Sequence, residues 1–181
     1  MKTLTESTNQ GRHIVDYKLS LENMISKGKY DLSFWVPFKI CGSRRVEFEE
    51  KIFRFFHTVS SSDEVVAQIT GYDPKNPWEP AKVENILFFG ANNPEIQRRL
   101  TIIALGSVGE SHGRPVVAFL SRDGYRRELG VLYLSNIWTD CDYCFLAVRR
   151  VKKNYIYWRR RFGSFLHRLV ARLTPQTAHS C

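Results

Sequence analysis

The chain has 181 residues, 43% of them hydrophobic and 13% aromatic, a composition that excludes a disordered protein and suits one globular domain. No apolar run reaches the roughly 18 residues that span a membrane, and the polar first residues lack the apolar segment of a secretory signal. A cytoplasmic protein with no transmembrane segment is therefore predicted. The formal net charge of +9 is compatible with an anionic partner, so its distribution along the chain matters.

The basic excess lies at the end of the chain. Residues 1–148 contain 18 basic and 18 acidic side chains, and no Asp or Glu occurs from Tyr143 onward. The excess consists of Arg149, Arg150, Lys152, Lys153, Arg159, Arg160, Arg161, Arg168 and Arg172. The fold itself is therefore expected to be formally neutral and to be followed by a basic segment.

The first part of the chain predicts a flexible end, a helix and an extended segment. Residues 1–13 are polar, as mobile termini usually are. Ser20 is a good helix N-cap, and the apolar residues after it recur at helical spacing as far as Gly28, which ends the helix. Residues 30–40 favour an extended segment or an edge strand, because Pro37 cannot donate a hydrogen bond in a central strand.

The middle of the chain alternates strand and helix signals around a proline-rich segment. The elements predicted there are a strand over 45–59, a helix from Ser60 to Gly71, a helix over 81–89 that Gly90 ends, and a short helix over 93–99. Segment 72–80 contains three prolines, which makes it a surface loop and the best candidate for an internal boundary. Pro80 suits the first turn of the helix that follows.

The last part of the fold is predicted to be a four-stranded antiparallel β-meander. Polar segments, the first two of which contain glycine, separate four apolar runs, over residues 102–108, 115–120, 128–134 and 143–148. One face of this sheet can hold ten inward side chains, namely Ile103, Leu105, Val116, Ala118, Leu120, Leu129, Val131, Tyr133, Leu146 and Val148. A lone meander of this size is marginal, so the preceding helices are expected to cover it.

The predicted fold class is therefore α+β, with short helices packed on a C-terminal antiparallel meander. Residues 14–150 are expected to form a single domain, within which 81–150 are one helix-plus-meander unit. Residues 151–181 are expected to form a basic amphipathic helix, because six apolar side chains recur there at steps of three and four residues. These are Phe162, Phe165, Leu166, Leu169, Val170 and Leu173.

Several short motifs across residues 14–150 form a further pattern. They are DYKLSLENMI at 16–25, GKYD at 28–31, PA at 80–81, LFFGA at 87–91, PEIQR at 94–98, IALGSV at 103–108, and Trp138 with FLAVR at 145–149. Taken together, these motifs resemble a family of small uncharacterised proteins from candidate-phyla, Parcubacteria-like bacteria. That family has no established activity, so the resemblance implies no catalytic or binding residue. Cys144 stands where its members commonly have arginine.

Two constellations point weakly to an enzyme. Cys141 and Cys144 form a C-x-x-C, which suits a redox pair or half a zinc site, but no second C-x-x-C exists and the motif enters a strand. The alternative is two reduced cysteines in a core or loop. Ser107, His112 and Asp123 provide the residue types of a catalytic triad without a G-x-S-x-G motif. We therefore expect no metal and no cofactor, and a protein that is not an enzyme.

Aromatic and polar side chains cluster on the last two predicted strands and the loop that joins them. They are Tyr125, Tyr133, Asn136, Trp138, Asp140, Asp142 and Tyr143. Such a row on a rigid sheet is typical of a surface that recognises a protein partner. The alternative is that Trp138 and some of the tyrosines complete the core. The hairpin Arg122–Arg127 has an Asp-Gly turn, and its arginines suit either a solvated turn or contact with phosphate.

Three functions are thus open at the level of the sequence. The first is a non-enzymatic binding module that uses the aromatic and polar face and the loop 135–142 to bind a protein. The second is binding of nucleic acid or an anionic membrane surface through the nine basic residues from Arg149 to Arg172. The third is a small thiol- or metal-dependent enzyme that uses the C-x-x-C.

Overall fold

The computed structural model describes residues 6–33, 38–40, 42–56, 59–134, 138 and 143–151. The strands are β1 (Glu6–Asp16), β2 (Leu32–Ser33), β3 (Arg45–Arg54), β4 (Glu79–Pro80), β5 (Thr101–Ser111), β6 (Arg114–Asp123), β7 (Arg126–Tyr133) and β8 (Tyr143–Arg150). The helices are α1 (Leu21–Gly28), α2 (Ser62–Gly71), α3 (Val83–Asn92) and α4 (Pro94–Gln97). The chain is thus a mixed α+β protein, as predicted. It divides into two units, Met1–Arg150 and Val151–Cys181. Apart from Val151, the second unit lies outside the described residues, and so does the basic helix predicted there.

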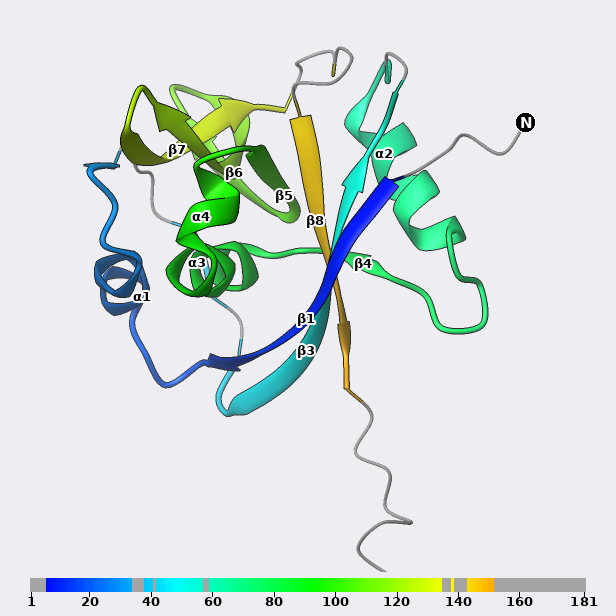
Figure 1. Cartoon of the computed structure of the whole chain (residues 1–181), viewed down its shortest axis with the longest axis horizontal. Helices are drawn as coiled ribbons and strands as arrows, with labels where there is room; N and C mark the ends of the chain where they lie inside the picture. The colour runs from blue at the N-terminus through cyan, green and yellow to red at the C-terminus, as the bar shows by residue number, and fades with distance from the viewer. Residues whose placement is uncertain are drawn as a thin grey trace, which may run out of the picture. The chain divides into compact units, whose positions relative to one another are not determined.

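The described strands form one sheet in the order β1-β3-β8-β5-β6-β7-β2, with β4 beside β8 (Figure 1). Strands β5, β6 and β7 are the first three strands of the predicted meander. The prediction is wrong for the fourth strand, because β8 runs parallel to β5 and antiparallel to β3. Its five residues from Cys144 to Val148 are all buried. A continuous apolar run of this kind is typical of a central strand with both faces covered, which a place beside β7 would not provide.

The sheet is buried on both faces, each by a different set of side chains. On the helical face, α1, α3 and α4 pack over residues that include Val15, Ile102, Leu120 and Leu146. On the aromatic face, α2 packs with a cluster that contains Phe53, Trp78, Ile103, Trp138 and Phe145. Figure 1 shows α1, α3 and α4 on one side of the sheet and α2 on the other.

The predicted single inward face is therefore wrong for β5. Ile102 and Ala104 lie on the helical face with the other predicted residues, whereas Ile103 and Leu105 lie on the aromatic face. The run Ile102–Leu105 is apolar at every position, so its alternation cannot be read when both faces are buried. An irregularity in the β5–β6 register between Ala104 and Val108 shifts the pattern further.

The N-terminal segment is not a flexible end from Glu6 onward, as had been predicted for residues 1–13. It forms β1, which pairs with β3 at the edge of the sheet. His13 and Val15 point into the core, while the alternating residues Arg12 and Ile14 are exposed. A polar strand of this kind suits an edge, where one side faces water and polar residues discourage pairing with other chains.

Helix α1 confirms its prediction, since Ser20 Oγ accepts a hydrogen bond from the Asn23 N–H at 3.3 Å. Helix α3 begins and ends later than predicted. Pro80 belongs to β4, and Gly90 lies inside the helix, where a Cβ would come within 2.5 Å of the Tyr30 hydroxyl oxygen. Close packing against Tyr30, and not helix termination, is what requires glycine there.

The proline-rich segment 72–80 is not a boundary between domains. Trp78 is buried in the cluster on the aromatic face, and Glu79 and Pro80 pair with Val148 and Ala147 of β8. The extended segment predicted at 30–40 includes β2, a two-residue strand parallel to β7 at the sheet edge. In the part of the chain that the structure describes, no helix has the length and apolar character needed to cross a membrane.

Candidate functional site: a pocket at the N-terminus of helix α3

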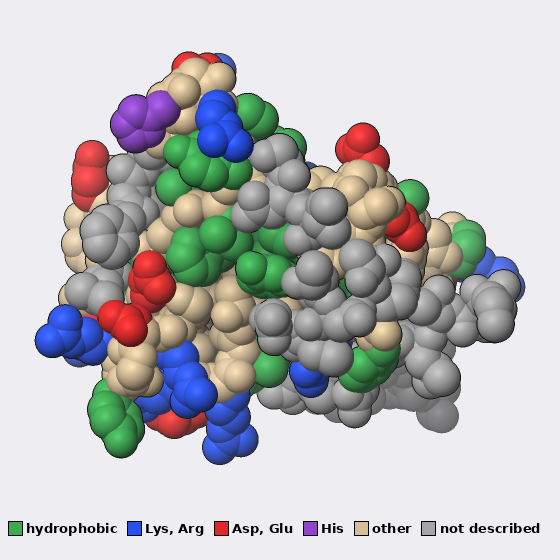
Figure 2. Space-filling model, turned by 90° about the horizontal axis from the view of Figure 1, so that it is seen from above, with side chains coloured by type: hydrophobic (Ala, Val, Ile, Leu, Met, Phe, Trp, Pro, Cys, Tyr) green, Lys and Arg blue, Asp and Glu red, His purple; other side chains and the backbone are tan. Residues whose placement is uncertain are grey.

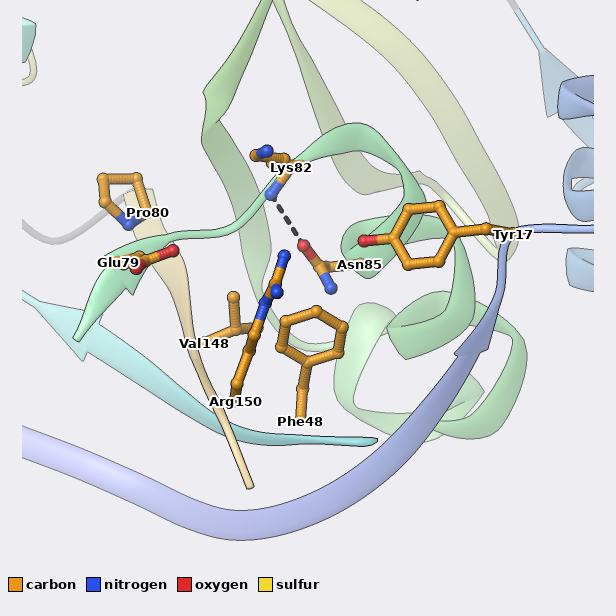
Figure 3. A pocket seen from close by; sticks show the side chains of 8 residues that line it. All are labelled: Tyr17, Phe48, Glu79, Pro80, Lys82, Asn85, Val148 and Arg150. Atoms are coloured by element: carbon orange, nitrogen blue, oxygen red, sulfur yellow. Dashed lines mark hydrogen bonds between the residues drawn. The ribbon is translucent and has the colours of Figure 1, made fainter. Parts of the chain in front are cut away.

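A pocket lies where the first turn of α3 meets the sheet (Figure 3). Its lining comes from the end of β1, from β3, β4 and β8, and from α3 itself. The lining residues are Tyr17, Phe48, Glu79, Pro80, Lys82, Asn85, Val148 and Arg150. The cavity measures about 20 Å³, which is enough for a water molecule or for one oxygen of an anion. A larger ligand would therefore insert one polar atom and leave its remainder outside.

Three contacts fix the start of α3 at this place. The Lys82 N–H donates to Asn85 Oδ1 at 3.0 Å, which reproduces half of a capping box. The Val83 N–H donates to Ser107 Oγ of β5 at 3.1 Å. The Ala81 N–H donates to the Leu146 carbonyl of β8 at 2.9 Å. The helix N-terminus, with its partial positive charge, is thereby held against the central strands of the sheet.

Asn85 has a buried side-chain donor that no described group satisfies. Its side chain is only 1% exposed, and its Nδ2 has no hydrogen-bond partner in the described part of the protein. In Figure 3 the amide lies in the middle of the lining residues, with Tyr17, Phe48 and Arg150 around it. A buried donor without a partner costs about 1–3 kcal/mol. An acceptor placed in the pocket would remove that cost.

The rim of the pocket is mainly basic. Lys82 and Arg150 are exposed, and neither forms an ion pair with a described carboxylate. Glu79, also exposed, is the single acidic residue of the lining and disfavours an anion on its side. Tyr17 and Phe48 supply aromatic walls. The balance of two cations, a buried amide donor and a helix N-terminus favours a negatively charged group over a neutral one.

A buried acid–base pair lies next to the pocket but does not line it. His13 Nδ1 is 2.7 Å from Glu50 Oε2, without the alignment of a hydrogen bond, and both side chains are buried. The His13 ring stacks on Phe48 with ring centroids 5.8 Å apart. Phe48 lines the pocket and His13 does not, so the Phe48 ring lies between the pocket and the histidine. A ligand in the pocket would therefore not touch this pair.

Unsatisfied polar atoms concentrate around this part of the helical face. Among the described residues, buried side-chain atoms without a hydrogen-bond partner occur in His13, Glu50, Glu84 and Asn85. Glu84 is completely buried in the first turn of α3, and neither of its carboxylate oxygens has a partner. Buried polar groups are normally paired, so such a concentration is typical of a functional site.

Comparison with known proteins does not identify a relative of this chain. No known protein family, curated protein or solved structure matches the chain. The chemistry of the pocket therefore has to be inferred from its own residues.

The aromatic surface predicted on the last strands is not a single surface. Trp138 is 2% exposed, and its Nε1 donates to Ser62 Oγ at 3.2 Å, so it completes the core on the aromatic face. Tyr143 packs edge-on against Trp138, with ring centroids 5.5 Å apart. Tyr133 packs on the opposite, helical face, with the Arg114 guanidinium 4.0 Å from its ring centre. Of the described tyrosines in this set, Tyr125 alone is fully exposed.

Asn136, Asp140 and Asp142, the other residues of that predicted surface, lie outside the described residues. The error arose because alternation places aromatic residues on opposite faces of a strand without showing which face is covered. Here α2 and Trp78 cover the face that the meander alone would have left open.

Of the two cysteines in the predicted thiol site, the structure describes only Cys144, and its surroundings disfavour a reactive thiolate. Cys144 is a buried free cysteine, and burial raises the pKa of its thiol to about 11. The reactive species of a cysteine is the thiolate, so this group is inert at neutral pH. Cys141 lies outside the described residues. Among those that are described, no three His, Cys, Asp or Glu side chains are placed to hold a metal ion.

The residues of the hypothetical triad are not assembled. Ser107 Oγ accepts the Val83 N–H at the start of α3, so its hydroxyl has a structural partner. His112 is exposed in the turn between β5 and β6, with φ at 51°. Asp123 is exposed at the far end of β6, a strand of ten residues. A strand of that length is about 30 Å long, so no contact between the two is possible.

Of the nine basic residues predicted to contact nucleic acid, two are described. Arg149 is engaged within the fold, with its Nε 2.6 Å from Glu49 Oε2 and its guanidinium 4.4 Å from the Trp78 ring centre. The hydrogen bond from Arg149 holds the pKa of Glu49 below its usual value. Arg150 lines the pocket instead. The others lie outside the described residues: Lys152, Lys153, Arg159, Arg160, Arg161, Arg168 and Arg172.

The pocket residues Tyr17, Lys82 and Asn85 were not predicted as a site. A local signal existed, because Asn85 stands three residues after Lys82, where its side chain can cap the first helical turn. The pocket also needs Tyr17, Phe48 and Val148, which are far apart in the sequence. Their meeting depends on the position of β8 between β3 and β5, which the meander prediction missed.

Proposed function

We propose that this protein is a non-enzymatic binding domain that holds a small anionic group at the N-terminus of α3. The observation that carries the proposal is the Nδ2 of Asn85, a buried donor without a partner that faces a pocket with a basic rim. A phosphate and a carboxylate share the chemistry that would satisfy it, namely a charged oxygen small enough to enter the cavity.

Each part of the pocket has a role in this proposal. The anionic oxygen would accept from Asn85 Nδ2 and lie near the positive end of the α3 dipole. Lys82 and Arg150 would neutralise the remaining charge from the rim, where both residues are exposed. Tyr17 would form an aromatic wall beside the ligand. Glu79 would disfavour ligands with a second anionic group on its side.

The lining residues support binding and not catalysis. They include no Ser, Cys or His, the side chains that most often act as a nucleophile or a neutral-pH base, and the Glu79 and Lys82 side chains are exposed on the rim. His13 and Glu50, which form the nearest acid–base pair, are separated from the ligand position by Phe48. This is the physical reason for proposing a binding function.

The test is an NMR titration of the full chain with inorganic phosphate and, separately, with acetate. Binding is expected to shift the side-chain amide signals of Asn85 and the backbone amides at the start of α3. Asn85→Asp keeps an oxygen to accept the Lys82 N–H but replaces the Nδ2 donor by a second oxygen. A hydrogen bond to a charged group contributes about 1.5–3 kcal/mol, so affinity should fall about tenfold or more.

Lys82→Gln is a second variant that changes an exposed residue and leaves the core intact. Lys75→Gln is its matched control, because Lys75 is also exposed but lies in the loop between α2 and β4. The proposal predicts weaker phosphate binding for Lys82→Gln and unchanged binding for Lys75→Gln. Equal affinities in the wild type, Lys82→Gln and a folded Asn85→Asp would refute it. The relative strength of phosphate and acetate identifies the preferred anion.

A further inference from the structure

A second surface, distinct from the pocket, surrounds the tip of the β6–β7 hairpin. Tyr125 is 99% exposed there, and the cations Arg122 and Arg126 flank it in the sequence. Two further exposed cations, Lys29 and Arg99, belong to elements that meet this hairpin. We name the set Lys29, Arg99, Arg122, Tyr125 and Arg126 the basic corner. Figure 2 shows several Lys and Arg side chains at the lower left of the molecule, with Asp and Glu side chains next to them.

Buried hydrogen bonds assemble the basic corner. Gln97 Nε2 donates to the Ser121 carbonyl at 3.0 Å and to the Glu128 carbonyl at 2.9 Å, so the end of α4 rests on the hairpin. Arg127 Nη1 donates to the Gly28 carbonyl at 2.7 Å, which ties the end of α1 to the start of β7. Lys29 follows Gly28 directly in the chain, and Arg99 lies two residues after Gln97. The cations are thus brought together by the fold.

The cations of the basic corner are not neutralised by the described protein. None of Lys29, Arg99, Arg122 and Arg126 forms an ion pair with a described carboxylate. The nearby acids have other partners: Asp31 Oδ2 accepts the Arg127 N–H, and Glu128 Oε2 accepts the Ser121 hydroxyl, both at 2.7 Å. Asp123 lies opposite Arg126 in the register without an ion pair. The four cations outnumber the three carboxylates of Asp31, Asp123 and Glu128, so the corner keeps a net positive charge that suits a polyanion.

The exposed Tyr125 ring favours single-stranded nucleic acid over an acidic protein as the polyanion. The ring is exposed and contributes nothing to the core. The turn does not require it either, because the turn is made by Gly124, whose φ of 60° suits glycine. An exposed aromatic ring beside unpaired arginines is the arrangement that binds unpaired bases by stacking and the backbone by charge. A protein partner would instead need an apolar centre to its interface. The Tyr125 ring is the one apolar side chain of the corner.

We propose that the basic corner binds single-stranded nucleic acid, with a base stacked on Tyr125 and phosphates on Arg122 and Arg126. The proposal is independent of the anion pocket, which lies at the other end of α3. It also differs from binding through residues 151–181, because it places the contacts on the β6–β7 hairpin. A duplex would not offer the unpaired base that Tyr125 requires.

The experiment measures binding of a fluorescently labelled oligothymidylate of about 15 nucleotides to the full chain by anisotropy, over a range of salt concentrations. The double variant Arg122→Glu/Arg126→Glu is compared with Arg44→Glu/Lys75→Glu. Both pairs change the net charge equally, and Arg44 and Lys75 are exposed, lie outside the corner and form no ion pair with a described carboxylate. The comparison therefore cancels any contribution from total charge or from the basic end of the chain.

The corner variant is expected to bind at least about tenfold more weakly than the control variant. Its salt slope should fall by about 1.4, since each phosphate contact on a single strand contributes about 0.7. Tyr125→Ala should weaken binding by about tenfold, and Tyr125→Phe should restore it, because stacking needs the ring and not the hydroxyl. Equal weakening by both double variants, or unchanged binding by Tyr125→Ala, would overturn the proposal. Polyglutamate that binds with the same dependence on Tyr125 would also overturn it, in favour of an acidic protein.

Discussion

The two ends of helix α3 lie on the same face of the sheet, but they differ in whether the buried polar groups beside them have hydrogen-bond partners. At the C-terminal end, Arg127 is buried, and its guanidinium donates to Gln97 Oε1 and to the carbonyls of Gly28 and Gly90. At the N-terminal end, the carboxylate of Glu84 and the Nδ2 of Asn85 are also buried and have no hydrogen-bond partner among the described residues. One end is complete within the fold, and the other is not.

The difference separates a structural role from a binding role. A cation at a helix C-terminus is favoured by the dipole, and here it joins α1, α3 and α4 to β7 through bonds that all lie within the protein. The positive end of the same dipole faces the pocket, and its first turn also carries the buried carboxylate of Glu84. Tyr30 marks the closed end as well, since burial raises the pKa of its hydroxyl far above the usual value. The open end is where a ligand would complete the set of hydrogen bonds.

The largest effect should come from removing the guanidinium at the closed end. Arg127→Met keeps much of the side-chain volume but leaves the Gln97 amide oxygen and the carbonyls of Gly28 and Gly90 without their donor. Each unsatisfied buried group costs about 1–3 kcal/mol, so a loss of roughly 3–5 kcal/mol in the free energy of unfolding is expected. Urea denaturation followed by circular dichroism measures it.

The neighbouring residue is the control for this variant. Arg126 is exposed, so Arg126→Met should change the free energy of unfolding by no more than about 0.5 kcal/mol. Similar losses for the two variants would mean that the network around Arg127 does not hold the helices on the sheet. Affinity for phosphate should be unchanged in Arg126→Met, because the pocket lies at the other end of α3.

A smaller effect, of opposite sign, is expected at the open end. Glu84→Gln replaces a buried carboxylate without a partner by a neutral amide of the same shape. Removing that desolvation cost should stabilise the protein by about 1–3 kcal/mol, reduced by up to about 1 kcal/mol for the lost interaction with the helix dipole. A higher urea midpoint would confirm that this end is destabilised. A marked loss of stability would show instead that the Glu84 carboxylate is well satisfied in the folded protein.

The local features of the fold were predictable from the sequence, and the long-range ones were not. Ser20 and the serines before α2 begin helices because a side-chain oxygen next to an apolar pattern is a short-range signal. The place of β8 was missed because a strand buried on both faces carries no alternation to show its neighbours. The same ambiguity placed Ile103 on the wrong face.

The candidate site could be predicted even less. Trp138 was assigned to a surface because nothing in its neighbourhood shows that α2 covers it, and its contact with Ser62 spans 76 positions. Tyr125 was assigned correctly to an exposed position, since an Asp-Gly turn between two strands leaves the next residue at the tip. Asn85 looks like any polar residue in a first helical turn, and its unpaired Nδ2 is visible only once Phe48 and Val148 close around it.

Cys144 offers a way to measure how strongly the helical face excludes water, independently of both ends of α3. It belongs to the same cluster, and burial raises the pKa of its thiol to about 11 from an ordinary value of 9.0. Because the folded-state pKa is the higher one, the protonated thiol stabilises the fold fully below pH 9. That contribution is lost as the pH rises from about 9 to about 11.

The expected result is a stability difference between the wild type and Cys144→Ala that shrinks over this pH interval, by up to about 2 kcal/mol. Comparing the two proteins at each pH cancels the titration of tyrosines and lysines, which both retain. The measurement is urea denaturation at a series of pH values under reducing conditions. A difference independent of pH would mean that water reaches the thiol. In that case water could reach the Asn85 amide on the same face and satisfy it as readily as an anion does. Anion binding at Asn85 would then lose its physical basis.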